Sequence, residues 1–485
     1  MKIHLNIYEK ILPIITWLTI TSPFWLSPFH PAIVAYFIIA FDVYFFYKSF
    51  KTAYQSVVAY RKIILYQKID FLKRLKKRKG LKDIKHFIII PNYKEKVEKI
   101  TSTIKNITLS EIDSKNFYLV LAFEEREREA KEKDKKIRNI FQKKFKKIIS
   151  TYHPLLEGEE AGKASNQTYA AKKINEFVKK NHWLDKNVII TICDADSLLP
   201  KNYFSYLTYQ YLTDKNHLFH FYWAPVLLYN NFWQLPLFVR IQATLSSILR
   251  LAFLEEKENL IQISTYSTNL WLLKQVNFWD VDIIPEDWHI YLQAFFKFGE
   301  KIKTLPLYTI VNGDAVYSGS LIKTLINRYQ QEKRWAWGVT DIGYALKNLF
   351  SAPKPNFFLK LKKIIYLAET HFLWPTTFFI LTISANIPPL INPVFRQTVL
   401  GFFLPKTAGF ILTLASVFLV LYVYLDIRLR LILKQKVKTI SVPFLLIQWY
   451  LLPVVSFFFS SLPALDSHTR ILLGKKIKYQ VTEKV

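Results

Sequence analysis

The chain has 485 residues, of which 51% are hydrophobic and 16% aromatic, a composition too apolar for an ordinary soluble enzyme. Its 67 Lys and Arg residues against 37 Asp and Glu residues leave a formal charge of +30. The basic clusters lie beside apolar runs, which favours a membrane over nucleic acid as the partner. The single cysteine, Cys193, excludes an internal disulfide, and its apolar neighbours predict an inert buried thiol.

Two apolar runs near the N-terminus predict a helical hairpin in the membrane. Residues 11–29 carry no charge and residues 31–47 carry only Asp42, so each run approaches the roughly 20 residues that a spanning helix needs. A cleaved signal peptide is not expected, because no small-residue cleavage site follows the first run and a second run comes at once. We assign residues 1–50 to this hairpin and residues 51–84 to a basic juxtamembrane linker or interfacial helix.

Strand and helix patterns alternate through the polar middle of the chain. Short apolar runs predict four strands, over residues 86–90, 117–123, 148–152 and 188–192. Apolar residues at helical spacing predict three helices, over residues 95–107, 164–179 and 200–212. The highly charged stretch 124–147 predicts a further helix whose charges are nearly all solvated. Because such alternation is typical of a mostly parallel sheet, we take residues 85–345 as one α/β domain.

Three more apolar runs predict C-terminal membrane helices, over residues 372–391, 408–425 and 442–465. We assign residues 346–371 to an interfacial segment, 372–465 to these helices and 466–485 to a basic tail. Clusters of Lys and Arg beside the apolar runs mark the cytoplasmic side. They comprise Lys73, Arg74, Lys76, Lys77, Arg78, Lys79, Lys360, Lys362, Lys363, Arg428, Arg430, Lys434, Lys436, Lys438, Lys475, Lys476 and Lys478.

The side on which the basic tail lies is left open by this pattern. Three C-terminal spans would leave the tail outside. Either the last run, which contains Pro453 and Pro463, is re-entrant or broken, or the tail is external despite its charge.

Paired carboxylates follow the fourth predicted strand. Asp194 and Asp196 come directly after the apolar run 188–192, and open α/β sheets bind ligands at the carboxyl ends of their strands. Such a pair can simply end a strand, but hard divalent cations also take oxygen ligands that they share with substrate phosphates. Glycine is scarce, with 11 in the chain, so phosphates would be held by metal and side chains rather than by a glycine-rich loop.

Several motifs, taken in order, resemble the membrane-embedded family-2 glycosyltransferases, the group that includes cellulose, chitin and hyaluronan synthases. The matching segments are Ile90-Pro91-Asn92-Tyr93-Lys94-Glu95, Gly162-Lys163-Ala164-Ser165-Asn166, Asp194-Ala195-Asp196, Pro285-Glu286-Asp287 and Gln331 to Trp335. The resemblance extends over residues 85–345 and implies a GT-A-like α/β domain with a mostly parallel mixed sheet, flanked by transmembrane helices. The segment 153–159 is unlike the well-known synthases and suggests a distinct branch.

The resemblance also implies a role for each motif. The nucleotide sugar would be bound by Pro91, Asn92, Glu95, Glu124, Lys163 and Asp194, while Asp194 and Asp196 would hold Mg²⁺ or Mn²⁺. The family commonly has an acidic residue after the second strand that meets the base and ribose. Here Glu124 or Glu125 substitutes, unless both are charges in the first turn of a helix.

The predicted chemistry needs one proton acceptor. A divalent ion neutralises the departing diphosphate, and a carboxylate takes the proton of the attacking hydroxyl. Asp287 is the predicted base, ahead of Glu286, although a helix cap after Pro285 is the structural alternative. Because no covalent sugar intermediate is formed, a single base predicts inversion at the anomeric carbon.

The other residues predicted to meet the acceptor or the diphosphate are Glu286 and the Gln331 segment. Gln331 and Arg334 lie about one helical turn apart and reach the same phosphate or sugar edge. Trp335 stacks on a pyranose, unless it is a core aromatic. Tyr266, Ser267 and Asn269, on a predicted strand, line the acceptor pocket or are buried polar strand positions.

We therefore expect an inverting, metal-dependent glycosyltransferase in the plasma membrane, with its catalytic domain in the cytoplasm. The donor is a nucleotide-diphosphate sugar, with a UDP-sugar expected first, and the acceptor is a polysaccharide or a lipid-linked glycan. Processive synthesis and single transfer both stay open, and no nucleic-acid partner is expected. An alternative function of another class is an inactive basic membrane scaffold or a channel-like protein. This alternative is disfavoured because the motif residues are intact: Asp194, Asp196, Asp287 and Arg334.

Overall fold

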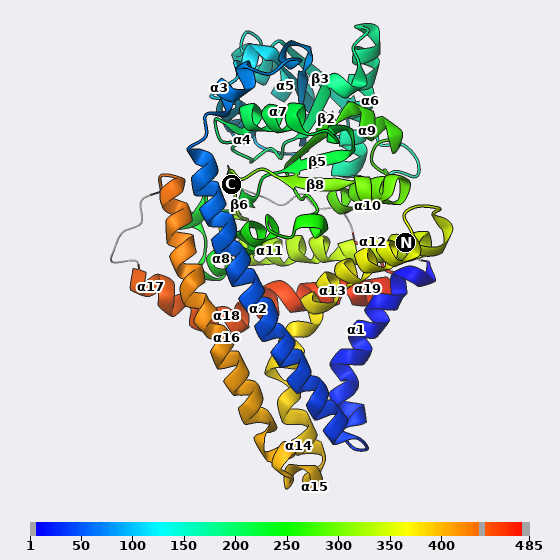
Figure 1. Cartoon of the computed structure of the whole chain (residues 1–485), viewed down its shortest axis with the longest axis vertical. Coiled ribbons are helices and arrows are strands. Elements are labelled where there is room, and N and C mark those ends of the chain that lie inside the picture. Colours follow the sequence, from blue (N-terminus) through cyan, green and yellow to red (C-terminus); the bar gives the residue numbers. More distant parts are fainter. Residues whose placement is uncertain (1–5, 436–441, 478–485) are drawn as a thin grey trace.

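The computed structural model describes residues 6–435 and 442–477. An α/β domain stands on a wedge of long helices that narrows to a tip at α14 (Ile387–Ile391) and α15 (Pro393–Arg396) (Figure 1). Between the two lie α11 (Leu321–Ala336) and α12 (Thr340–Ser351), which run across the wide end of the wedge. The chain is therefore organised as an α/β domain that rests on apolar helices.

A seven-stranded sheet forms the centre of the α/β domain, in the order β3-β2-β1-β4-β7-β5-β8. Its strands are β1 (Lys85–Asn92), β2 (Phe117–Glu124), β3 (Lys147–His153), β4 (Val188–Ile192), β5 (His220–Trp223), β7 (Tyr266–Asn269) and β8 (Lys303–Pro306). Only β7 runs antiparallel to its neighbours. The other pairs are parallel, which confirms the predicted mostly parallel mixed sheet. A small second sheet pairs β6 (Val226–Leu227) with β9 (Val311–Asn312).

Alternating apolar residues of the strands fill a core on each face of the sheet. From β1, Phe87 and Ile89 point to one face, where α6 (Lys163–Lys180) packs, and Ile88 and Ile90 point to the other. That second face is covered by α4 (Val97–Ile107), α5 (Ala130–Phe141) and α7 (Tyr203–Thr213). Because both faces are covered, β1, β2 and β4 are continuous apolar runs, as buried parallel strands generally are. These runs made the three strands predictable, whereas the edge strand β3 mixes buried and more exposed residues.

The prediction that the charges of residues 124–147 are nearly all solvated is wrong. Strand β2 extends to Glu124 and α5 begins only at Ala130. Within this stretch Glu124, Glu127, Lys133 and Asp134 are buried. Each has a partner: Lys133 pairs with Glu127, and Asp134 accepts hydrogen bonds from Arg138 (2.9 Å) and Tyr152 (2.8 Å). Burial of charge is tolerated where the charge is paired and hydrogen-bonded.

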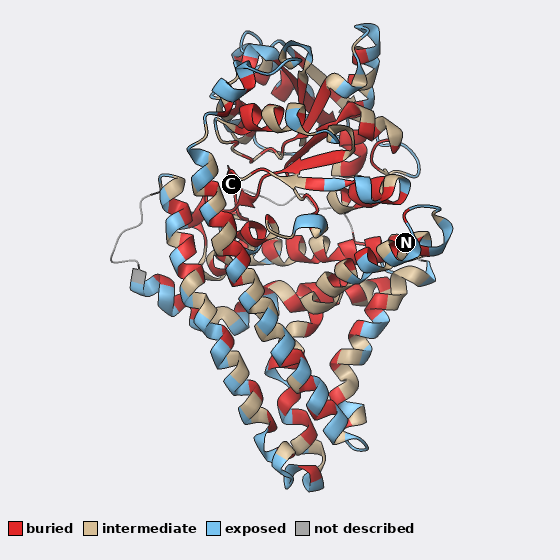
Figure 2. Ribbon diagram, viewed as in Figure 1, coloured by how far each residue is buried: buried red, intermediate tan, exposed pale blue. Residues whose placement is uncertain are grey.

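Four stretches of the described residues are long and apolar enough to cross a membrane, by length and composition. They are α2 (Pro31–Gln67), α13 (Phe357–Thr382), α16 (Val399–Ile432) and the stretch Pro443–Leu472. Helix α1 (Ile7–Leu26) forms the predicted hairpin with α2 but is not among the four. Figure 2 shows exposed residues along the outer sides of the wedge, although its sequence is apolar.

Helix α2 is longer than predicted, so the first basic cluster lies farther from the apolar run than expected. Its 37 residues extend about 55 Å, well beyond the roughly 30 Å of a hydrocarbon core. Residues 51–67 therefore continue the helix, and the cluster from Lys73 to Lys79 begins in the short helix α3 (Phe71–Lys76), which packs on α7. The cluster is a surface of the α/β domain rather than a direct flank of the apolar run.

The last apolar run is broken. It forms α17 (Val442–Ile447), α18 (Leu452–Ser456) and α19 (Leu462–Leu472), which lie across the long helices (Figure 1). Pro453 and Pro463 stand in the first turns of α18 and α19, and Phe459 has non-helical backbone angles. Lys476 forms an ion pair with Glu160 of the α/β domain. Of the two predicted alternatives, the structure has the broken run, and the start of the tail lies beside the α/β domain. Lys436, Lys438 and Lys478 lie outside the described residues.

Candidate active site

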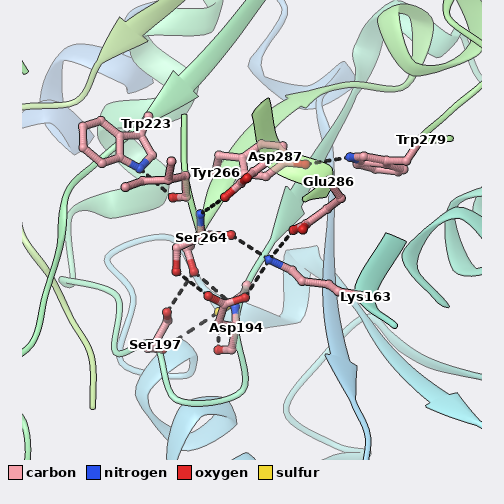
Figure 3. A network of polar contacts seen from close by, with 12 residues as sticks. Lys163, Asp194, Ser197, Trp223, Ser264, Tyr266, Trp279, Glu286 and Asp287 are labelled. Atoms are coloured by element: carbon pink, nitrogen blue, oxygen red, sulfur yellow. Dashed lines mark hydrogen bonds and ion pairs between the residues drawn. The ribbon is translucent and has the colours of Figure 1, made fainter. Parts of the chain in front are cut away.

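The candidate site gathers side chains from separate parts of the chain at the carboxyl end of β4. Asp194 follows β4, Lys163 begins α6, and Glu286 and Asp287 begin α10 (Glu286–Phe298). The segment that contains Ser264 precedes β7 and lies between these side chains (Figure 3). Three predicted motifs, far apart in sequence, therefore form one polar cluster.

Lys163 is the centre of this cluster. Its Nζ lies 2.8 Å from Asp194 Oδ1 and 2.8 Å from Glu286 Oε1, and it donates a hydrogen bond of 3.0 Å to the Ser264 carbonyl (Figure 3). Burial works against the charged ammonium, yet Asp194, Glu286 and Asp287 hold the pKa of Lys163 well above its ordinary value. The lysine is thus a fixed cation that joins the Asp194 motif to the Glu286 motif.

Asp287 is oriented by backbone donors. Its Oδ2 accepts a hydrogen bond from Ser264 N (2.9 Å) and its Oδ1 one from Trp288 N (3.0 Å). Burial, reinforced by the negative charge of Glu286, raises the pKa of Asp287 to about 7, although Lys163 and the two N–H groups oppose the rise. A carboxylate with a pKa near neutrality is well suited to accept a proton. No side chain caps the N-terminus of α10, where Pro285 is the N-cap residue.

Asp194 and Asp196 supply oxygens of the kind that hard divalent cations prefer. Both are half-buried, and Asp196 Oδ2 accepts a 3.2 Å hydrogen bond from Asp314 N. Within the described residues no group of three or more His, Cys, Asp or Glu side chains could hold a metal. Two carboxylates nevertheless fit Mg²⁺ or Mn²⁺, since such ions commonly use one or two carboxylates and complete their shell with substrate phosphates and water.

The residues predicted for the nucleotide gather at the ends of β1 and β2. The parallel register places Pro91 beside Ala122, and the buried Asn92 donates a 3.2 Å hydrogen bond to the Ala122 carbonyl. The carboxylate of Glu124 is buried against Arg126, as an end-of-strand side chain rather than a helix charge.

Two residues near the ends of β1 and β2 were not among the residues predicted for the nucleotide. The guanidinium of Arg126 lies 4.1 Å from the ring centroid of Tyr93. The carbonyl of Glu95 accepts a 2.8 Å hydrogen bond from Lys133. Arg126 and Lys133 lie in the highly charged stretch 124–147, where the sequence does not distinguish buried charges from solvated ones.

The Gln331 segment lies on α11 and is more buried than its polar residues suggest. Gln331 is buried and accepts a hydrogen bond from Arg328, whereas Arg334 and Trp335 are half-buried. Two guanidinium groups lie by the indole of Trp335: that of Arg328 at 4.9 Å and that of Arg250 at 5.6 Å from the ring centroid. Arg250 comes from α8 (Leu237–Phe253). No motif marked either arginine in the sequence.

The polar residues of β7 have structural partners. Ser267 Oγ lies 2.8 Å from Thr191 Oγ1, and Asn269 caps α9 (Leu270–Gln275) by accepting from Leu272 N at 2.8 Å. Tyr266 accepts a 2.7 Å hydrogen bond from Trp279. These contacts favour buried strand positions over an acceptor pocket. Cys193 is fully buried, and burial, followed by the charges of Asp194 and Asp196, raises its pKa well above the ordinary value, as expected for an inert thiol.

Comparison with known proteins defines the class of this chain as a glycosyltransferase. The family model described as glycosyl transferase family group 2 matches residues 189–459, more than half of the chain. The chain belongs to this family. Its mostly parallel mixed sheet, with apolar helices beside it, is the predicted GT-A-like fold class.

Two solved structures are weakly similar to the chain. A mannosyltransferase from Pyrobaculum calidifontis, in complex with GDP-Man and Mn²⁺, has 13% identity and a TM-score of 0.42, and the match covers 82% of this chain and 100% of that one. The S. aureus TarS fragment 1–349 has 10% identity and a TM-score of 0.36, with 69% and 90% covered. No curated protein matches the chain.

Proposed function

We propose that this protein transfers a sugar, with inversion, from a nucleotide-diphosphate sugar to a membrane-associated glycan or lipid-linked acceptor. The observation that carries the proposal is the convergence of Lys163, Asp194, Glu286 and Asp287 at one end of β4. A single oriented base beside a fixed cation suits direct displacement at an anomeric carbon. It also argues against an inactive scaffold, which would have no need to bury this cluster of charges.

The donor side of the proposed site consists of Asp194, Asp196 and Lys163, with the ends of β1 and β2 beyond them. Asp194 and Asp196 are the residues that would hold Mg²⁺ or Mn²⁺, and the bound ion supplies positive charge for the departing diphosphate. Lys163 contributes a second positive charge through its raised pKa. Pro91, Asn92, Glu95 and Glu124 are the proposed contacts to the nucleotide, for which a UDP-sugar is the first candidate.

Asp287 is the proposed catalytic base. The Ser264 and Trp288 N–H groups fix its carboxylate, and its pKa of about 7 leaves it able to take the proton of the attacking hydroxyl. Glu286, Gln331, Arg334 and Trp335 are the proposed contacts to the acceptor or the diphosphate. The indole of Trp335, with two guanidinium groups beside it, is proposed as the platform for the acceptor sugar.

We further propose that the wedge lies in the plasma membrane with the α/β domain in the cytoplasm. The outward side chains of α16 are large and apolar: Phe402, Phe410, Val417 and Val420 are each more than half exposed. An apolar surface of this extent on a free protein would aggregate, whereas lipid would cover it. The basic residues on the side of the α/β domain favour the cytoplasmic orientation.

Site-directed labelling tests this orientation. Cysteines introduced at Lys82 and at Lys475 should react only with reagents that reach the cytoplasm, because both lie on the side of the α/β domain. A cysteine at Val394, exposed at the tip of the wedge, is the matched control and should react from outside intact cells. The native Cys193 is buried and adds little background. Labelling of Lys82→Cys from outside would overturn the orientation.

A panel of nucleotide sugars tests the activity itself. The purified full-length protein is incubated with each donor, with Mn²⁺ or Mg²⁺, and release of the nucleoside diphosphate is measured. One or a few donors should be turned over, and the length of the product on a gel separates single transfer from processive synthesis. Absence of turnover with every donor, both with added polysaccharide and with lipid-linked acceptors, would favour the inactive scaffold.

A further inference from the structure

A buried ion-pair cluster lies on α10, on the side of the helix opposite the proposed base Asp287. His289, on α10, has both ring nitrogens against carboxylates: Nδ1 is 2.7 Å from Asp341 Oδ1 and Nε2 is 2.9 Å from Asp280 Oδ2. The side chains of His289 and Asp341 are almost completely buried, at 4% and 2% exposure, whereas Asp280 is 44% exposed. An ionised carboxylate only accepts hydrogen bonds, so each ring nitrogen carries a proton when both aspartates are ionised. A carboxylate against each ring nitrogen thus favours a cationic imidazole, although burial raises the pKa of Asp341.

The cluster connects three separate elements. Asp280 belongs to the loop that leads into the Glu286 motif, His289 to α10, and Asp341 to the first turn of α12. Helix α12 follows the Gln331 segment and packs against α1, α10 and α13. His289 thus ties the helix that carries Asp287 to an element that rests on the wedge.

His289 and Asp287 hold α10 from opposite sides. Side chains two positions apart on an α-helix point in directions about 200° apart around the helix axis. Asp287 therefore faces Ser264, while His289 faces α12. The turn between α11 and α12 is also close: a Cβ on Gly338 would lie 3.1 Å from His371 Cε1 and 3.8 Å from Pro285 Cβ. The start of α10 therefore has neighbours on two sides: the turn between α11 and α12 lies near Pro285, and α12 contacts His289.

We propose that His289, as an imidazolium between Asp280 and Asp341, is a positioning residue that sets the orientation of Asp287 toward the acceptor hydroxyl. This inference rests on the proposed function, because it presumes that Asp287 is the base. None of the sequence motifs includes His289. In this proposal the orientation of Asp287 depends on the charged His289, which does not itself contact the substrate.

The groups that surround His289 support its charged state. Besides Asp280 and Asp341, it faces the ring of Tyr344, whose centroid is 4.4 Å away, and Glu286 adds negative charge near Asp341. Burial opposes the charge, but the two carboxylates raise the pKa of His289 to about 9. Since this pKa is raised above the unfolded value of about 6.5, the stabilisation is complete below pH 6.5 and is lost as pH rises through 9.

The test uses the full-length protein in detergent and the nucleotide sugar with the highest turnover in the panel. His289→Gln keeps a polar group but removes the cation. We expect kcat to fall about 10²-fold, because small displacements of a catalytic group have effects of that size. The KM for the donor should stay within about threefold, since ground-state binding is retained. Wild-type kcat should decline above pH 9, and this alkaline decline should be absent in His289→Gln.

Asp280→Asn is the second variant, because the exposed side chain tolerates replacement even if His289→Gln does not fold. Removal of one carboxylate should move the alkaline decline of kcat to lower pH. Full kcat in His289→Gln, or an unmoved decline in Asp280→Asn, would overturn the positioning role. Asp287→Asn is measured in the same assay. If this variant retains the wild-type rate, the assignment of Asp287 as the base fails. If it is inactive while His289→Gln keeps the wild-type rate, only the positioning role of His289 is rejected.

Discussion

Asp287→Asn should lower turnover by roughly 10²–10⁴-fold while donor affinity stays near that of the wild type. The amide keeps the size of the side chain and its oxygen can still accept from Ser264 N, but it cannot take a proton. Rate loss without binding loss is expected when an interaction is used mainly in the transition state. Turnover is measured with saturating donor, and donor affinity is measured by calorimetric titration.

The pH profile gives an independent check on the same residue. Because burial and Glu286 raise the pKa of Asp287 to about 7, wild-type activity should rise with pH through about 7 as the carboxylate ionises. The residual activity of Asp287→Asn should lack this limb. Glu286→Gln is the matched control: it removes the neighbouring negative charge, so the limb should move to lower pH. An undiminished rate in Asp287→Asn would make the residue a structural group and Glu286 the next candidate.

The parallel half of the sheet was predictable from the sequence because its strands are buried on both faces. Strands β1, β2 and β4 are continuous apolar runs that no solvent-facing residue interrupts. The strands β5, β6, β8 and β9 have two to four residues each. Strands of that length have too few residues for a periodicity, and only their pairing partners, which are distant in sequence, define them.

The motifs of the site were predictable one by one, but their contacts were not. Lys163 alone would be a surface lysine by its local sequence, and only the fold places its Nζ between Asp194 and Glu286. Ser264 contacts Asp287 and Lys163 through its backbone N–H and carbonyl groups, which every residue has, and contacts Asp194 through its hydroxyl. Residue type gives no sign of the two backbone contacts, and a single serine outside any motif gives little sign of the third.

The partners of buried charges were also not predictable from the sequence. His289 and Asp341 are 52 positions apart and become partners only through packing of α10 on α12. The broken run 442–472 shows the same limit, since its composition fits a spanning helix and its direction is set by contacts with α8, α11 and α13. Local composition predicts burial in an apolar phase, but it does not predict partners.

Asp196→Ala and Asp194→Ala should each abolish metal-dependent donor binding. Loss of one carboxylate leaves a hard cation under-coordinated in a site that completes its shell with the diphosphate. Changes to less direct contacts of metal sites already cost about 10–100-fold in metal affinity, so we expect donor affinity in Mn²⁺ to fall by at least about 100-fold. Calorimetric titration of the donor, with Mn²⁺ and with EDTA, measures the effect.

Two comparisons separate loss of the metal from loss of charge. Asp282→Ala removes an equal charge from an exposed position in the loop before Glu286 and should leave donor affinity unchanged. Asp194→Ala also frees Lys163 from one of its two carboxylates, whereas Asp196→Ala does not, so Asp196→Ala is the cleaner variant. In wild type EDTA should weaken donor binding as much as Asp196→Ala does, and the two should not add, because both remove the same ion. Wild-type donor affinity in both aspartate variants with Mn²⁺ present would reject the metal assignment, and the departing diphosphate would then depend on Lys163 and the arginines beside Trp335.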